Sequence, residues 1–359
     1  MIRIEPVSDG ASFHNSLASI PALSPEWRSR AVARLNSLTK PLGSLGRMEE
    51  IAARLVQIVQ EERPRFGKKV IFTLAADHGV ADEGVSAYPK EVTRQMVLNF
   101  LTGGAAINVL ARHGGIDVVV VDIGVDGDFG EAPGLVHAKV ARGTANMARG
   151  PAMSEAELDA ALGVGIELAA WAAKQGYSLI GTGEMGIGNT TAASAITAVL
   201  AGRPTAQVAG RGTGLDDPGL QKKVAVIAQA LDINRPDPAK PLDVLQKVGG
   251  LEIAGLTGVI VGAASRRIPV VVDGFISSAA AACALEPRVR PFLFAGHRSS
   301  EPGHAALLEI IADAPLLDLH MRLGEGTGAA LAMNVIDAAA KIYDEMATFA
   351  SGGISEASA

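Results

Sequence analysis

Polar residues stand beside glycines at six places in the sequence, each following a short apolar run. Glycine lets a ligand or another backbone segment approach closely, and a neighbouring polar side chain can bind a substrate or move a proton. The pattern therefore indicates a small-molecule site assembled from loops. The six places are residues 77–79, 122–124, 183–186, 273–274, 296–300 and 324–328.

Glu325 has glycines on both sides in the loop Gly324-Glu325-Gly326-Thr327-Gly328. Its immediate neighbours carry no side chain that could shield its carboxylate or pair with it. The carboxylate is either a solvated loop charge or a proton acceptor directed into a cleft. The residue types alone leave both interpretations open. A related glycine loop, Gly210-Arg211-Gly212-Thr213-Gly214, has no acidic residue.

Residues 181–186 match the pattern G-x-G-x-x-G, which in some proteins binds a dinucleotide. Such a site also needs a second strand that ends in an acidic residue about 20 positions further on. The corresponding region, residues 203–207, reads RPTAQ and has neither feature. We therefore reject a nicotinamide dinucleotide site and expect no cofactor.

The next residues, 186–191, place glycines just before a predicted helix with Asn189 or Thr190 as its cap. Free backbone N–H groups at the start of a helix attract phosphate. The alternative is a tight strand-to-helix turn with an ordinary cap. The sequence contains no G-x-x-x-x-G-K-[ST] loop, which argues against triphosphate hydrolysis.

The sequence gives little support for a catalytic metal site or for a catalytic triad. Asp77, His78 and His297 are scattered, and no H-x-x-x-H or H-E-x-x-H spacing occurs, so we expect no catalytic metal. Ser299 has no G-x-S-x-G context and no evident base with an orienting partner.

Composition narrows the class of protein. The chain has 359 residues, 48% of them hydrophobic, and a net charge of −6. This charge argues against a nucleic-acid or membrane-surface partner, because both need a basic footprint. The single cysteine, Cys283, lies in an alanine run and is expected to be a small buried side chain. Because we find no signal peptide and no apolar stretch of about 18 residues, we expect a cytoplasmic protein.

The elements that position these loops alternate between strands and helices. Short, continuous apolar runs indicate strands buried on both faces, and hence a mainly parallel sheet. We expect an α/β fold with a doubly wound, Rossmann-like sheet. The predicted strands cover residues 70–75, 118–123, 179–181, 270–273, 292–294 and 316–319.

Helices are predicted between these strands and at both ends of the chain. Ser154-Glu155-Ala156-Glu157 has the form of a capping box that opens one of them. Two helices near the start, 25–35 and 48–61, have no strand between them. We therefore expect a small helical subdomain from residues 1–65 and 329–359, beside an α/β domain of residues 66–328. The other predicted helices cover residues 91–112, 154–174, 190–200, 219–231, 252–266, 303–312 and 326–345, and 236–241 is predicted to be a loop.

Six motifs of this chain resemble, in the same order, those of the nicotinate-nucleotide–dimethylbenzimidazole phosphoribosyltransferase family. The resemblance extends from about Leu35 to Met333, and the motifs are long and unusual. They are NSLTKPLGSLG (36–46), ADHGV (76–80), GVSAYP (84–89), GEMGIGNTT (183–191), GRGTG (210–214) and GEGTG (324–328).

The resemblance implies a doubly wound sheet with a small helical domain, a homodimer, and two substrates, nicotinate mononucleotide and 5,6-dimethylbenzimidazole. The product would be α-ribazole 5′-phosphate, used for the lower ligand of cobalamin. Matching by motif makes Glu325 the catalytic base and places Ser86, Gln95 and Leu323 at the benzimidazole. The nucleotide and its phosphate would meet Glu184, Gly186, Gly188, Asn189, Thr190, Gly212, Lys223, Ser299 and Ser300.

Several points stay open at this level. Lys222 adjoins Lys223, so a shift of one residue would exchange their roles, and a solvated helix lysine is the alternative for either. Glu184 is a second hypothesis, as an electrostatic stabiliser of the ribosyl cation. The roles of Asp77, His78 and His297 and the base preferred in the cell are not determined. The rival functions are a dinucleotide-linked dehydrogenase and a nucleotide sensor without catalytic activity.

Overall fold

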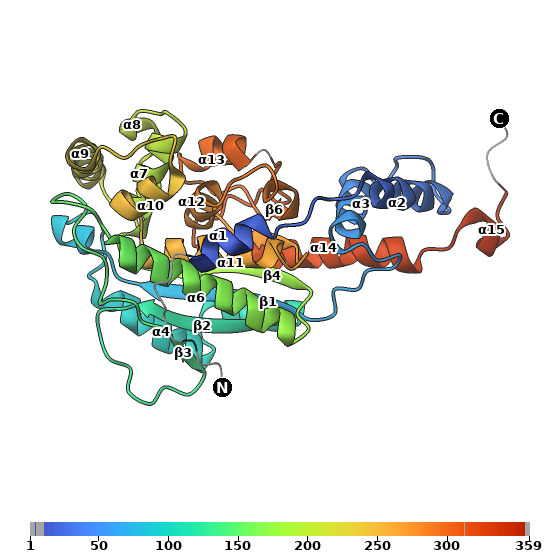
Figure 1. Ribbon diagram of the computed structural model, residues 1–359, viewed down its shortest axis with the longest axis horizontal. Helices are drawn as coiled ribbons and strands as arrows, with labels where there is room; N and C mark the ends of the chain where they lie inside the picture. Colours follow the sequence, from blue (N-terminus) through green and yellow to red (C-terminus); the bar gives the residue numbers. More distant parts are fainter. Residues whose placement is uncertain (1–3, 5–10, 312, 356–359) are drawn as a thin grey trace.

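The computed structural model describes residues 4, 11–311 and 313–355. These residues form one six-stranded sheet in which every pair of neighbours is parallel, in the order β3-β2-β1-β4-β5-β6 (Figure 1). The predicted α/β, doubly wound fold is confirmed. The strands are β1 (Lys69–Ala76), β2 (Ile116–Gly124), β3 (Leu135–His137), β4 (Leu179–Met185), β5 (Val270–Val272) and β6 (Leu293–Ala295).

The strand order reverses between β1 and β4. From β1 the chain adds β2 and β3 on one side, and it then returns to place β4, β5 and β6 on the other. In open parallel sheets this reversal opens a crevice at the carboxyl ends of the two central strands, which is where ligands bind. β1 is buried along its whole length, as its continuous apolar run predicted.

Helices cover both faces of the sheet. Leu74 of β1 lies against Gly255 of α11, whereas Ile71, three residues earlier and on the opposite face, lies against Gly326 before α14. The helices near the sheet and its loops are α1 (Ala11–Ala18), α4 (Glu91–Thr102), α5 (Ala106–Gly114), α6 (Glu155–Lys174), α7 (Asn189–Leu200), α8 (Thr205–Val208), α9 (Asp217–Asn234), α10 (Pro241–Val248), α11 (Leu251–Ala264), α12 (Phe275–Cys283), α13 (His304–Ile311) and α14 (Thr327–Glu345), with the short helices η1 (Gly79–Glu83) and η2 (Arg290–Phe292).

A group of helices projects from one end of the molecule. α2 (Pro25–Ser37) and α3 (Arg47–Val59) pack beside the C-terminal part of α14, and α15 (Phe349–Gly352) follows (Figure 1). The Arg34 side chain fastens α2 to α14, because it donates to the carbonyl oxygens of Tyr343 at 2.8 Å and Asp344 at 3.0 Å.

The helical group resembles the predicted subdomain, but α1 packs outside it and α14 crosses the proposed boundary. α1 packs against α6 and α11, and α14 is one continuous helix that also packs against β4. The division into residues 1–65 with 329–359 and residues 66–328 therefore stays a prediction. No helix among the described residues is long and apolar enough to cross a membrane.

Two local expectations were wrong, and the elements α1, α8, α10, α12 and β3 were not predicted. The helix predicted at 91–112 is two helices, since Gly103 adopts a left-handed φ of 79° and ends α4. Residues 316–319 form no strand; only Leu317 makes an isolated bridge, to His297. The edge strand β3 was missed because three residues carry no periodic signal. Helix α12 was missed because its alanine-rich sequence resembles any buried apolar run.

Candidate active site

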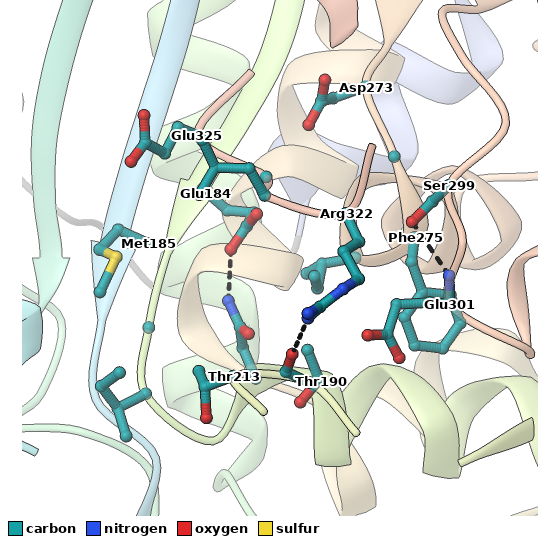
Figure 2. Close-up of a pocket in the computed structure, with 18 of the residues that line it drawn as sticks. Glu184, Met185, Thr190, Thr213, Asp273, Phe275, Ser299, Glu301, Arg322 and Glu325 are labelled. Carbon is teal, nitrogen blue, oxygen red and sulfur yellow. Dashed lines mark hydrogen bonds between the residues drawn. The ribbon is translucent and has the colours of Figure 1, made fainter. Parts of the chain in front are cut away.

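A pocket of about 480 Å³ lies over the carboxyl ends of β4, β5 and β6, as the strand-end residues predicted (Figure 2). Glu184 and Met185 reach it from β4, Asp273 from the end of β5 and His297 from the end of β6. It is lined by Tyr88, Val92, Met96, Glu184, Met185, Gly186, Ile187, Asn189, Thr190, Gly212, Thr213, Asp273, Gly274, Phe275, Ile276, His297, Ser299, Glu301, Arg322, Leu323, Gly324 and Glu325.

The loop that carries Glu325 is held against the two central strands. Gly324, Glu325 and Gly326 all have left-handed backbones, with φ values of 82°, 64° and 96°. A non-glycine residue in this region is strained and persists only where its surroundings hold it. Here the Thr73 hydroxyl of β1 donates to the Glu325 carbonyl at 3.1 Å. Gly183 of β4 permits the contact, because a Cβ there would lie 2.5 Å from the same carbonyl oxygen.

The Glu325 carboxylate is 6% exposed and lines the pocket. Its Oε2 accepts a hydrogen bond of 3.1 Å from the backbone N–H of Ile107, in the first turn of α5. Burial raises the pKa of Glu325 above its ordinary value, the Ile107 N–H opposes that shift, and Asp273 adds to it. The side chain is thus a positioned carboxylate with increased basicity and is not a solvated loop charge.

Glu184 is more deeply enclosed. Its Oε2 accepts from the amide of Asn189, and Gly324 lies so close that a Cβ there would be 2.2 Å from Oε1. Burial, with the nearby carboxylates of Asp273 and Glu252, raises the pKa of Glu184 to about 8. At neutral pH the ligand-free pocket therefore holds Glu184 mainly as the neutral acid.

Asp273 and His297 are the pocket residues that follow β5 and β6. One carboxylate oxygen of Asp273 accepts from the N–H of Ala329 at 2.8 Å, at the amino end of α14. Burial raises the pKa of Asp273, and His297 opposes the shift. Both residues line the pocket, which gives His297 a location that the sequence left undetermined.

The residues matched to the phosphate surround the amino end of α7. Gly188 caps this helix with a φ of 99°. Thr190, in the first turn, accepts a 2.8 Å hydrogen bond from Nζ of Lys223, which also donates to Gly210 O. A Cβ at Gly212 would lie 3.3 Å from the same Nζ.

Lys223, and not Lys222, is the lysine in this cluster. Its side chain is fully buried behind Thr190, and burial lowers its pKa to about 8. Lys222 is exposed and lies near Gly84. The structure thus brings Lys223 and not Lys222 to this cluster, and the contact of either lysine with a phosphate stays a prediction.

The segment after β6 brings Ser299 to the pocket but not Ser300. The Ser299 N–H donates to Nδ1 of His304 at 2.7 Å, so the proton of this imidazole is on Nε2, 2.9 Å from Ser278 Oγ. Burial lowers the pKa of His304 to about 3, which keeps the ring neutral. The Ser300 N–H donates to Met321 O, and Ser300 lies outside the pocket lining.

Apolar side chains also line the pocket, namely Tyr88, Val92, Met96, Met185, Phe275, Ile276 and Leu323. Figure 2 shows Met185 on the side of Glu325 and Phe275 beside Ser299 and Glu301.

Of the residues matched to the benzimidazole, only Leu323 belongs to this lining. Ser86 Oγ lies 3.1 Å from Thr213 Oγ1, and Gln95 is exposed on α4 beside Met96. Contact of Ser86 and Gln95 with the base stays a prediction.

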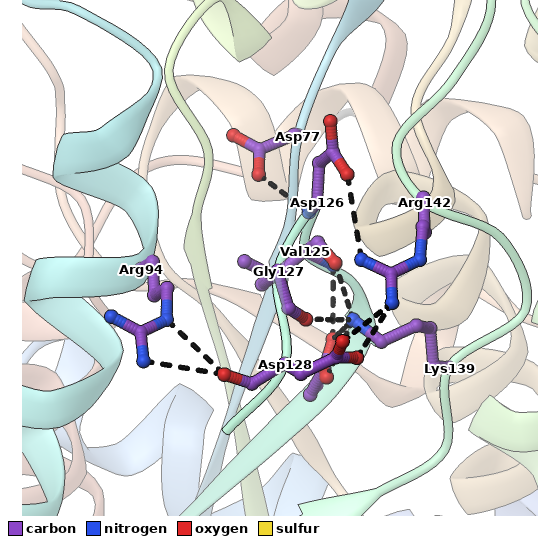
Figure 3. A network of polar contacts seen from close by, with 9 residues as sticks. Asp77, Arg94, Val125, Asp126, Gly127, Asp128, Lys139 and Arg142 are labelled. Atoms are coloured by element: carbon purple, nitrogen blue, oxygen red, sulfur yellow. Dashed lines mark hydrogen bonds and ion pairs between the residues drawn. The ribbon is translucent and has the colours of Figure 1, made fainter. Parts of the chain in front are cut away.

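Asp77 and His78 lie behind the pocket and hold its loops. Asp77 accepts from the N–H of Asp126 at 2.8 Å, within a polar network that fixes the loop after β2 (Figure 3). His78 Nε2 is 2.8 Å from a buried oxygen of Glu252, and its ring contacts both Gly186 and Gly250. No group of three potential metal ligands occurs among the described residues.

Two charged lining residues were missed from the sequence. Arg322 reaches across the pocket mouth and donates to Gly212 O at 2.6 Å, so it joins two glycine loops (Figure 2). Glu301 follows Ser299 and turns its carboxylate inward. Arg322 could have been predicted because it is close in sequence to the 324–328 loop. No sequence signal pointed to Glu301.

Comparisons with known proteins agree with the geometry. A family model described as "Phosphoribosyltransferase" (DBI_PRT) matches residues 20–354. The chain is 60% identical over 341 residues to the nicotinate-nucleotide–dimethylbenzimidazole phosphoribosyltransferase of Geobacter metallireducens, a match that covers 94% of this chain and 97% of that protein. The enzyme of the same name from Chloroflexus aggregans is 57% identical over 339 residues, 94% of this chain and 96% of that protein.

A solved structure agrees as well. The crystal structure of CobT from Thermus thermophilus superposes with a TM-score of 0.89 at 48% identity, covering 93% of this chain and 100% of that one.

Proposed function

The chain belongs to the nicotinate-nucleotide–dimethylbenzimidazole phosphoribosyltransferase family, and we propose that its pocket transfers the phosphoribosyl group of nicotinate mononucleotide to 5,6-dimethylbenzimidazole. The products are α-ribazole 5′-phosphate and nicotinate. The pocket supports this reaction because it combines apolar side chains that can hold a flat base, the amino end of α7 for a phosphate, and the carboxyl groups of Glu184 and Glu325.

The donor enters with its phosphate at the amino end of α7. The start of a helix attracts phosphate, and Thr190 and Lys223 add polar groups at the start of α7. Gly212 and Ser299 complete the cluster, with Ser300 just outside it. This arrangement directs the ribose towards Glu184 and the middle of the pocket.

The leaving group needs no general acid. The nicotinate ring is a quaternary pyridinium in the donor and departs with a neutral ring nitrogen, unlike the alkoxide-like leaving group of a glycosidase. The acceptor presents the difficulty, because a benzimidazole that attacks through one nitrogen and keeps the proton on the other becomes cationic. A base at that second nitrogen removes the charge as it forms.

Glu325 is the residue that fits this task. Its carboxylate lines the same pocket as Tyr88, Val92, Met96 and Leu323, which can hold a planar base. One oxygen is occupied by the Ile107 N–H, which leaves the other oxygen available to accept the proton. The new C1′–N bond forms as the C1′–nicotinate bond breaks, and the benzimidazole proton moves to Glu325.

Glu184 acts electrostatically on the ribose. It is protonated in the empty pocket at neutral pH, but a pyridinium or an oxocarbenium-like ribose beside it favours the ionised form. Placing the pyridinium of the donor beside Glu184 thus generates the charge that stabilises the transition state. Asp273, whose charge already acts on Glu184, contributes negative potential of the same sign.

The two rings lie on opposite faces of the ribose, so the attack inverts the anomeric carbon from β to α. Holding both rings in line supplies much of the acceleration. The observation that carries this proposal is that one pocket holds both the Glu325 carboxylate and Thr190, whose hydroxyl accepts a hydrogen bond from the buried Lys223.

The test is to incubate the protein with both substrates and to identify the product by mass and anomeric configuration. An α-linked product supports the proposal, whereas a β-linked product or no product contradicts it. The homodimer implied by the family resemblance also stays a proposal, and the mass of the protein in solution tests it.

A further inference from the structure

Glu301 is a carboxylate whose position the proposed reaction does not explain. It lines the pocket, is 6% exposed, and lies against Gly210, whose carbonyl oxygen accepts from Lys223 in the cluster proposed for phosphate. An acidic side chain beside a phosphate is repulsive, so its presence there needs another reason.

The surroundings of Glu301 supply no hydrogen-bond donor for one of its oxygens. Its Oε2 is buried, and none of the residues that the structure describes donates to it. This oxygen lies against Gly210, where a Cβ would be 1.8 Å away. A buried acceptor without a protein donor is costly, and its hydrogen bond must come from water or from a ligand in the adjoining pocket.

Lys223 is near enough that the negative charge of Glu301 supports its positive charge, but Lys223 Nζ donates to Thr190 Oγ1 and Gly210 O. A role as counter-ion therefore leaves the buried oxygen unpaired. Figure 2 shows the Glu301 carboxylate turned into the pocket, between Thr190 and Phe275.

We propose that Glu301 binds the hydroxyl groups of the donor ribose and thereby selects ribosyl over deoxyribosyl donors. This inference rests on the proposed function. A carboxylate accepts hydrogen bonds and cannot donate them, and the 2′- and 3′-hydroxyls of a ribose are adjacent donors. With its phosphate at Thr190 and Lys223, a donor brings its ribose past Glu301 on the way to Glu184.

The experiment measures kcat/KM for nicotinate mononucleotide and for its 2′-deoxy and 3′-deoxy analogues, in the wild type and in Glu301→Gln. A hydrogen bond between a charged group and a hydroxyl raises kcat/KM by about 10- to 100-fold. We expect Glu301→Gln to lose about that factor on the ribosyl donor and much less on the analogue that lacks the bound hydroxyl. The different intrinsic reactivity of deoxy donors cancels, because each donor is compared between two proteins.

An equal loss of kcat/KM on all three donors would mean that Glu301 only stabilises the positive charge of Lys223. That result would overturn the inference. Glu309→Gln is the matched control, since Glu309 is an exposed carboxylate of α13 paired with Arg203; it should leave all three values unchanged.

A measurement on the wild type keeps the inference testable if Glu301→Gln fails to fold. Ribose 5-phosphate should inhibit the enzyme more strongly than at least one of its 2-deoxy and 3-deoxy analogues, and equal inhibition by all three overturns the inference. A wild type that forms no α-ribazole 5′-phosphate would instead refute the proposed function, so the two failures are distinguishable.

Discussion

The backbone N–H of Ile107 donates a hydrogen bond of 3.1 Å to the carboxylate of Glu325, and so joins the first turn of α5 to the loop before α14. The bond orients a side chain whose backbone is in a strained left-handed conformation. It also lowers the pKa of Glu325 while burial raises it, so the carboxylate becomes more basic yet remains able to ionise.

The pKa of Glu184, about 8 in the ligand-free pocket, predicts that donor binding releases a proton. Below pH 8 the free protein holds Glu184 mainly protonated, and the pyridinium of a bound donor favours its ionised form. Calorimetry at about pH 7.5 in buffers of different ionisation enthalpy should detect release of up to about one proton. Release should diminish as the pH rises above the pKa of Glu184.

Glu184→Gln is the control for that measurement, because the donor phosphate also exchanges protons and does so equally in both proteins. The difference between the wild type and Glu184→Gln isolates the contribution of Glu184. Identical proton release by the two proteins would show that Glu184 does not change its ionisation with the donor.

Lys223→Ala should weaken binding of nicotinate mononucleotide by about tenfold or more and change turnover less, because a buried charge–phosphate contact is removed. The matched control is Lys222→Ala, which removes an exposed lysine one residue away. Titration of each variant with the donor gives the comparison. An unchanged donor affinity in Lys223→Ala would refute the phosphate assignment.

Gly183→Ala should reduce turnover by about tenfold or more, because its Cβ would meet the Glu325 carbonyl at 2.5 Å and displace the loop. Overpacking of this kind also costs about 1–3 kcal/mol, so the melting temperature should fall by a few degrees. Gly150→Ala, at a glycine with open space around it, is the control. Wild-type turnover in Gly183→Ala would mean that the loop position is not critical.

The sequence predicted those parts of the fold that rest on local or periodic signals. β1 and β2 were evident from continuous apolar runs, and the capping box of Ser154 and Glu157 is present, with Glu157 N–H donating to Ser154 Oγ at 3.2 Å. The break at Gly103 was missed, although a Gly-Gly pair there is a recognised turn signal.

In the candidate site too, the residues with a local sequence signal were predicted and those without one were missed. Glu325 and Glu184 were identified because they adjoin glycines in long motifs, and the structure brings both to the pocket. Glu301 and Arg322 were missed because their importance depends on which loops meet in space. Arg322 acquires its position only through contact with Gly212, 110 residues away in the sequence.

The sharpest test of this mechanism is the rate of a single turnover in Glu325→Gln, with both substrates saturating and the donor affinity measured in parallel. The amide keeps the shape of the side chain but cannot take the benzimidazole proton. We predict that α-ribazole 5′-phosphate forms at least about 10²-fold more slowly while nicotinate mononucleotide binds as in the wild type. Product formation at the wild-type rate would contradict the assignment of Glu325 as the base.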